Sequence, residues 1–155
     1  MSFRTTFMTG LAALALILPV TAQAQMAVEG AYARSSGPMA QSGAAFMTIS
    51  NRGRVDDRLV GVASGAAARV ELHSHIADEN GIMRMRRVEA GLPIAAGSAH
   101  VLQRGGDHVM FMGLTGAWSQ GDTVTVTLIF EHAGPIEIDI SVDLERSAGR
   151  GQTGN

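Results

Sequence analysis

The segment GDHVMFMGL places His108, Met110 and Met112 at alternate positions of an apolar run. In a β-strand, successive side chains point to opposite faces, so the imidazole and the two thioethers would share one face. The valine and the phenylalanine between them are better core residues and would take the other face. The first face is therefore free to supply ligands to a soft metal ion.

A second set of potential metal ligands lies upstream, in the stretch VELHSHIADENGIMRMRRV. Strand alternation puts His73 and His75 on one face, and it puts Met83 and Met85 together on one face of the next strand. The Asn-Gly pair between the two strands favours an antiparallel hairpin, because both residues tolerate positive φ. Such a hairpin would bring His73 or His75 close to Met83 or Met85, and the strand GDHVMFMGL would add a third contribution.

Thioether sulfur and neutral imidazole together form a ligand set that favours Cu(I) over hard cations, which prefer carboxylate and carbonyl oxygen. The sequence contains no cysteine. Disulfides, thiolate metal sites and cysteine nucleophiles are therefore excluded, and so is a blue-copper electron-transfer centre, which requires a cysteine ligand. The function that these exclusions leave is binding and carrying a metal ion, with a copper ion as the bound partner.

Short runs rich in valine, isoleucine, threonine and phenylalanine must position these ligands, since helical periodicity is scarce after residue 24. Such runs, separated by Gly, Asn, Asp and Ser clusters, predict an all-β sandwich or barrel. TVTVTLIF alternates most clearly, whereas GLPIAAGSAH, with its proline and two glycines, is expected to be a connecting loop. The predicted strands are Ala27–Arg34, Ala44–Ser50, Arg58–Ala63, Ala68–Ile76, Gly81–Val88, Ala99–Leu102, His108–Leu114, Thr123–Phe130 and Ile136–Val142.

Residues 1–24 are expected to be a secretory signal peptide, because Arg4 precedes an apolar run and Ala22-Gln23-Ala24 forms a cleavage site. The run is too short for a membrane span and no second one follows, so none is predicted in the mature protein. Residues 25–144 are predicted to be one β domain, and 145–155, without large apolar residues, a flexible tail.

The chain has 12 basic and 14 acidic residues and a net charge of −2. It therefore lacks the excess of positive charge that is typical of nucleic-acid-binding proteins.

Three stretches, ELHSHIADENGIMRMRRVE, LPIAAGSAHVLQRGGDHVMFMGL and GDTVTVTLIFEHAG, resemble the periplasmic PCu(A)C family of copper chaperones, and so does the upstream SGAAFMTISN. The family pattern combines a histidine, a methionine after a hairpin and a later His-x-Met. The resemblance implies a cupredoxin-like Greek-key β-sandwich or barrel located in the periplasm. It also implies that the protein binds Cu(I) and passes it towards the CuA centre of cytochrome c oxidase subunit II, alongside a thiol-bearing assembly factor.

Carried over by position, the metal ligands of the family fall on His73, Met85, His108 and Met110. The spacings on either side of Met85 are each one residue longer here than in the family pattern. The longer spacing leaves His75 and Met83 open as substitutes within their pairs. Met112 is expected to be a hydrophobic shield that limits the access of water and oxygen.

Two other functions fit the same residues. A row of methionines can form an adaptable apolar patch, so the protein could be a periplasmic β-sandwich module for protein interaction. A copper site without delivery would instead make it a passive copper buffer in metal resistance. An enzyme is not expected, because no Ser-His-Asp arrangement, phosphate-binding glycine loop or paired carboxylates stand in a recognisable context.

Overall fold

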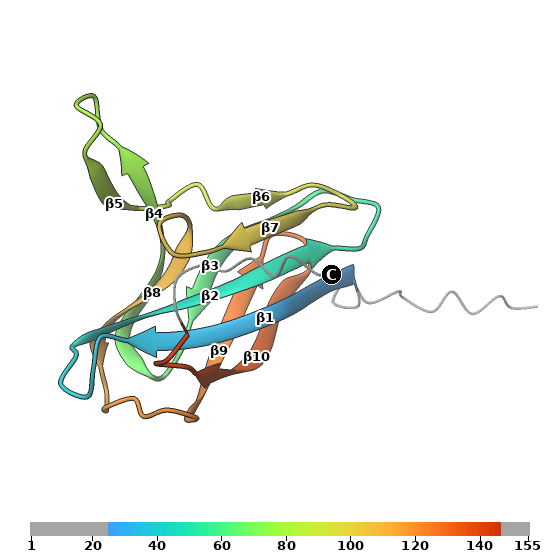
Figure 1. The fold of residues 1–155 in the computed structure, drawn as a ribbon. Coiled ribbons are helices and arrows are strands. Elements are labelled where there is room, and N and C mark those ends of the chain that lie inside the picture. The colour runs from blue at the N-terminus through green and yellow to red at the C-terminus, as the bar shows by residue number, and fades with distance from the viewer. Residues whose placement is uncertain (1–24, 147–155) are drawn as a thin grey trace, which may run out of the picture.

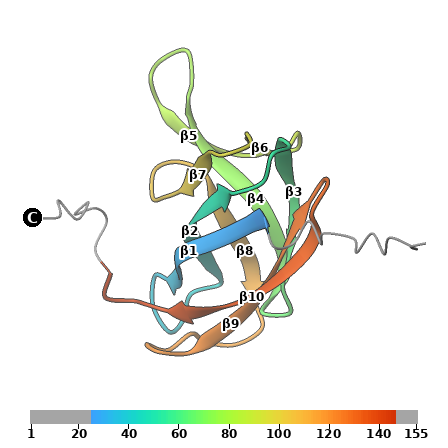
Figure 2. The same cartoon turned by 90° about the vertical axis from the view of Figure 1, so that its right-hand side faces the viewer.

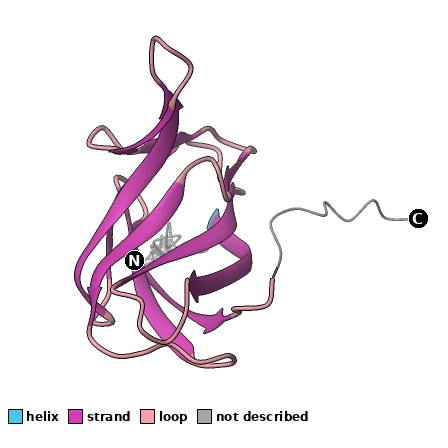
Figure 3. Cartoon of the chain, turned by 60° about the vertical axis from the view of Figure 1, so that its left-hand side comes forward, coloured by secondary structure: helices cyan, strands magenta, loops and turns pink. Residues whose placement is uncertain are grey.

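Ten β-strands and no α-helix are found in residues 25–146, the part of the chain that the computed structural model describes (Figures 1 and 3). The predicted signal peptide and most of the predicted tail lie outside these residues. Within them, no helix is long and apolar enough to cross a membrane. The all-β prediction is confirmed, and nine of the strands are those predicted, three with the same ends and six with ends shifted by one or two residues. The strands are β1 (Met26–Ser35), β2 (Ser42–Asn51), β3 (Asp57–Ala63), β4 (Ala67–Ala77), β5 (Met83–Arg87), β6 (Leu92–Ile94), β7 (Ala99–Leu102), β8 (His108–Leu114), β9 (Thr123–Phe130) and β10 (Gly134–Val142).

The strands form one sheet in the order β5-β4-β8-β2-β1-β10-β9-β3-β6, and β7 pairs with the half of β2 that β8 leaves free. Neighbours distant in the sequence, such as β4 and β8 or the parallel pair β1 and β10, are the crossovers expected of a Greek key. The sheet curls into an open barrel, in which β3 and β4 lie side by side without pairing (Figures 1 and 2). The β4–β5 hairpin extends beyond the barrel (Figure 1).

Alternation along the strands directs one face of each into a shared core. Val109 and Phe111 of β8 are completely buried, and the valines and leucine of β9 are buried while its threonines point outwards. The indole of Trp118 lies edge-on to the ring of Phe111, with 5.1 Å between the ring centroids. The inward and outward faces predicted for GDHVMFMGL are therefore confirmed.

The prediction of a plain connecting loop for GLPIAAGSAH is wrong, because Leu92–Ile94 forms β6. This strand pairs antiparallel with β3, which places Leu92 opposite Leu59. Leu92 and Ile94 are almost fully buried, so an extended backbone that sends both side chains into the core stabilises the segment. Pro93 is tolerated since β6 is the last strand of the sheet, and within residues 25–146 no strand pairs with its other edge.

The β4–β5 hairpin is antiparallel as predicted, but its loop is wider than a two-residue turn. The carboxylate of Asp78 accepts hydrogen bonds from the backbone N–H groups of Asn80 and Ile82, at 2.9 and 3.0 Å. Gly81 supplies the positive φ, +77°, that closes the loop. As a result, β5 begins at Met83 instead of Gly81.

Asp57 is a buried carboxylate that ties the start of β3 to the turn between β9 and β10. Its Oδ1 accepts hydrogen bonds from the backbone N–H groups of Arg58 at 2.7 Å and His132 at 3.0 Å, and its Oδ2 accepts one from Ala133 at 2.9 Å. Burial by itself raises the pKa of Asp57, but these donors outweigh burial and hold the pKa below its ordinary value of 3.8.

We expect Asp57→Ala to lower the free energy of unfolding by about 2–4 kcal/mol, because three backbone N–H groups, one buried and two part-buried, lose a charged acceptor. Since the pKa of Asp57 is lower in the folded than in the unfolded state, this stabilisation is present above the ordinary pKa and is lost as the pH falls through the folded value. Urea unfolding between about pH 7 and 2.5 measures both effects. Asp56→Ala removes one exposed acceptor, for the Ala96 N–H, and is the control; equal losses in both variants would contradict the assignment.

Candidate metal centre

The residues predicted to bind metal lie on the outer face of the sheet, outside the barrel core. His73 of β4 pairs with His108 of β8, and in the β4–β5 hairpin His75 pairs with Met85. Met110 follows on the same face of β8 as His108. Val109, between His108 and Met110 on β8, and Leu72, next to His73 on β4, belong to the core. Three strands thus bring the predicted imidazoles and thioethers to one surface.

A pocket of about 180 Å³ opens among these side chains and contains two imidazoles and two thioethers but no carboxylate. The ring of His75 stacks on that of His108, with 5.1 Å between centroids and 27° between planes. The ring of His73 stands edge-on to His108 at 6.0 Å and 64°. Of the four predicted ligands, three line the pocket, and His73 lies beside it. The lining residues are Ala44, Phe46, His75, Met85, Arg104, Gly105, His108 and Met110.

His108 is the most buried of the three histidines at the site, with 2 % of its surface exposed. Its Nδ1 lies 3.0 Å from the backbone carbonyl oxygen of Gly106. Because a carbonyl only accepts, Nδ1 carries the proton and the lone pair of Nε2 is left for a metal ion. Burial lowers the pKa of His108, which favours the neutral form that binds metal.

His73 is oriented by a carboxylate. Its Nε2–H donates a hydrogen bond to Oε2 of Glu71 at 3.0 Å, and Arg69 and Arg87 lie 3.6 and 3.5 Å from the other carboxylate oxygen. The hydrogen bond from His73 and the two arginines lower the pKa of Glu71 against the opposing effect of burial. A carboxylate behind a histidine is the usual arrangement around a metal ligand, since it fixes the tautomer and the ring orientation.

Both histidines of β4 have an unused nitrogen. Nδ1 of His73 and Nδ1 of His75 are buried and have no hydrogen-bond partner among the described residues. A buried polar atom without a partner costs free energy and calls for an explanation. Each of these atoms is a candidate donor to a metal ion between β4 and β8.

The four methionines near the site divide into two groups. Met85 and Met110 line the pocket. Met83 pairs with Ala77 at the far end of the hairpin, is 55 % exposed and lies outside the pocket lining. Met112 lies beyond the pocket, with its sulfur 3.7 Å from a guanidinium nitrogen of Arg69, so the expectation that it shields the site is wrong.

Phe46 and the β7–β8 loop complete the site, and both were missing from the sequence prediction. Phe46 is 6 % exposed although it lies on the outer face, where its ring lies 6.2 Å from that of His108. Alternation in AAFMTIS is the signal that could have found Phe46, because burial of Met47 in the core puts its neighbour on the outer face. The loop contributes Arg104 and Gly105 to the pocket lining, and only the fold shows this.

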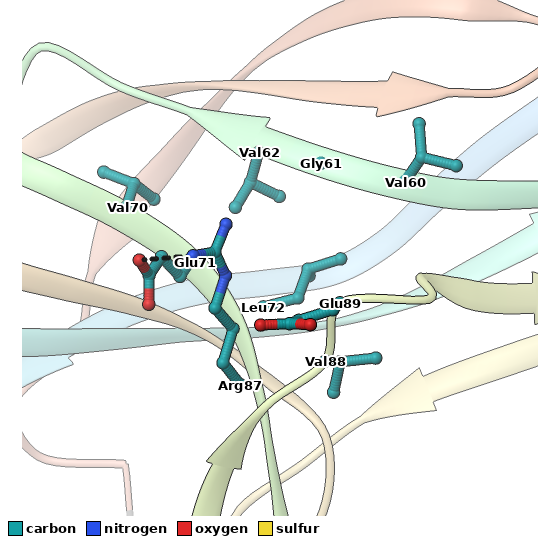
Figure 4. Close-up of a pocket in the computed structure, with 9 residues that line it drawn as sticks. All are labelled: Val60, Gly61, Val62, Val70, Glu71, Leu72, Arg87, Val88 and Glu89. Carbon is teal, nitrogen blue, oxygen red and sulfur yellow. Dashed lines mark ion pairs between the residues drawn. The ribbon is translucent and has the colours of Figure 1, made fainter.

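A separate pocket of about 260 Å³ lies where β3 faces β4 (Figure 4). Valines from both strands line it, together with Glu71 and Arg87, which are 3.5 Å apart. Its lining contains neither sulfur nor imidazole. In residues 25–146 no three His, Cys, Asp or Glu side chains are grouped to hold a metal ion, so the mixed imidazole and thioether pocket is the candidate centre.

The sequence profile of the LpqE-like family matches residues 26–142, from the start of β1 to the end of β10. The chain belongs to the LpqE-like family. A curated relative, "Putative lipoprotein Lxx21020" of Leifsonia xyli subsp. xyli (strain CTCB07), is 33% identical over 141 residues, which cover 86% of this chain and 82% of that protein.

Two solved structures extend the comparison. The copper-bound PCuAC domain from PmoF2 is 25% identical, covers 77% of this chain and 93% of its own, and superposes with a TM-score of 0.64. The Cu(I) form of DR1885 from Deinococcus radiodurans is 32% identical, covers 86% of this chain and 83% of its own, and has a TM-score of 0.60. The LpqE-like chain therefore has the cupredoxin-like fold of PCuAC domains, as the sequence predicted.

Proposed function

We propose that this LpqE-like protein is a Cu(I)-binding metallochaperone. The observation that carries the proposal is the pocket in which Met85 and Met110 meet His108 and His75 without any carboxylate. Thioether and neutral imidazole suit a soft monovalent ion, and hard cations lack the oxygen ligands they need there. The copper-bound and Cu(I) states of the two similar structures support the same metal.

We propose His73, Met85, His108 and Met110 as the ligands. The hydrogen bond to the carboxylate of Glu71 supports His73, whereas the buried, unpartnered Nδ1 is common to His73 and His75, and the pocket itself is lined by His75. His75 is then a wall of the pocket, stacked on the ring of His108. In the alternative, His75 is the ligand in place of His73, and mutation of each histidine distinguishes the two assignments.

Delivery towards the CuA centre of cytochrome c oxidase subunit II, alongside a thiol-bearing assembly factor, is the destination that the family resemblance supports. Export to the periplasm is supported by the leader-like residues 1–24 and by the lipoprotein name of the relative. Copper transfer from the loaded protein to an apo subunit II domain tests delivery. A protein that binds copper but transfers none would be a passive buffer.

An anaerobic titration with Cu(I) against a competing chelator tests the copper site. We expect uptake of one equivalent, with an affinity that falls in acid because protons compete for the imidazoles. Since burial lowers the pKa of His108, its contribution to this fall comes below the ordinary value of 6.5. The measurement therefore spans about pH 8 to 4.5. Uptake without a defined stoichiometry would favour the interaction module, and an affinity independent of pH would remove the histidines from the site.

A further inference from the structure

The metal pocket continues into a second pocket on the same outer face of the sheet. The second pocket, of about 260 Å³, reaches across β2 to β1. We define the two pockets together as the transverse groove, because they cross the strands. They share Ala44, Phe46, Arg104 and Met110. The end far from the metal pocket is lined by Arg34, Ser35, Ser36, Ser42 and Gly43.

The transverse groove has only positive and neutral side chains along its lining. No carboxylate lines either pocket, although acidic residues outnumber basic ones over the whole chain, 14 to 12. Arg104 has no side-chain hydrogen bond or ion pair within residues 25–146, and Arg34 uses one nitrogen on the backbone carbonyl of Arg146, at 2.8 Å. Because a guanidinium has five N–H donors, both arginines keep donors for a ligand.

We propose that the transverse groove docks an acidic, extended segment of the protein that receives the copper ion. Carboxylates of the segment would pair with Arg34 and Arg104, and a soft donor of the same segment would reach the metal pocket. Arginine and carboxylate form directed, charge-assisted hydrogen bonds, which suit a docking contact that must set orientation. The inference rests on the proposed function, since the occupant is the copper acceptor.

The shape of the groove favours a polypeptide segment over a small free carboxylate. The lining runs from Arg34 on β1 to Met85 on β5, across four strand-to-strand steps of the sheet. Neighbouring strands are about 4.8 Å apart, so this span exceeds the length of one small anion. Between the two ends, Ala44 and Phe46 provide an apolar floor. Met85, 45 % exposed, lies open to an incoming ligand at the metal end.

An NMR titration of the full chain with two synthetic peptides tests the docking. The first alternates aspartate with methionine, and the second carries asparagine in place of aspartate. We expect the acidic peptide to bind at least about tenfold more tightly to both the apo and the Cu(I)-loaded protein, and to shift the amide signals of Gly43 and Gly105. Salt should weaken its binding, because exposed charges are screened.

Arg34→Glu is expected to weaken the acidic peptide about tenfold or more while leaving Cu(I) affinity unchanged, because Arg34 lies outside the metal pocket. Arg54→Glu, at an exposed arginine of the β2–β3 loop, changes the net charge equally and should alter peptide affinity less than twofold. Amide spectra and thermal unfolding verify that both variants fold, and Arg104→Glu provides a second groove variant.

Several outcomes would overturn the docking proposal. Equal binding of both peptides, equal effects of Arg34→Glu and Arg54→Glu, or displacement of the peptide by an equal concentration of citrate would each do so, the last by indicating a small-anion site. These results leave copper uptake untouched. Conversely, a protein that binds the acidic peptide in the groove but takes up no Cu(I) would refute the proposed copper function and not the groove.

Discussion

Met85→Ala combined with Met110→Ala should lower the affinity for Cu(I) by at least about 1000-fold. Each substitution removes one of the two thioethers from the pocket, and a loss of about 30–100-fold for each corresponds to about 2–3 kcal/mol of binding free energy. Cu(II) binding should fall far less, because oxidation shifts the preference from sulfur to nitrogen and oxygen. Anaerobic chelator competition measures the first affinity, and calorimetry under air measures the second.

Met83→Ala and Met112→Ala are the matched controls for this experiment. Both residues lie on the same face as the pocket but outside its lining. We expect the double control variant to keep its Cu(I) affinity within about threefold. If the control pair costs as much as the pocket pair, copper is bound by a diffuse methionine surface, and the adaptable interaction patch becomes the better interpretation.

The local part of this site could be predicted from the sequence because it depends on a period of two. In GDHVMFMGL, strand alternation alone separates His108 and Met110 from the buried Val109 and Phe111. The same rule placed both β4 histidines on one face. Such predictions need no knowledge of neighbours, only the type of element.

Which strands meet at the site depends on the register between strands that are distant in the sequence. The alternation within one strand gives no information about this register. His73 lies opposite His108 because of the register between β4 and β8. Three strands, β5, β6 and β7, lie between these two strands in the chain. In the hairpin, Asp78 widens the loop, and the loop sets which β4 histidine faces Met85. The choice between His73 and His75 was therefore left open by the sequence.

The sequence also did not predict which side chains on the outer face are buried. An outward-facing residue is normally solvated, yet His108 and Phe46 are buried there. The β7–β8 loop, with Arg104 and Gly105, lines the pocket over them. Its conformation is supported by the hydrogen bond between His100 and Asp107, at 2.7 Å, which the fold brings together. Burial at a sheet surface depends on such a loop and not on strand period.

The choice between the two β4 histidines leads to the second large expected effect. His73→Ala should lower the affinity for Cu(I) by about 100-fold, because it removes a proposed ligand whose tautomer Glu71 fixes. His75→Ala should lower the affinity by less than about tenfold, since it removes a ring stacked on His108 and leaves the ligands in place. Chelator competition at about pH 7.5 compares the two variants.

Glu71→Gln tests whether His73 is the ligand, by an effect that unfolding of the protein would not produce. The neutral amide should accept the Nε2–H of His73 less strongly than a carboxylate flanked by Arg69 and Arg87, and Cu(I) affinity should fall about tenfold. Because the effect acts through His73, the same change in a His73→Ala background should have no further effect on affinity. Nitrogen chemical shifts of the imidazole would report the change in tautomer directly. A larger loss in His75→Ala than in His73→Ala, with Glu71→Gln silent, would transfer the fourth ligand to His75 and make the ion pairs around Glu71 a structural feature of β4.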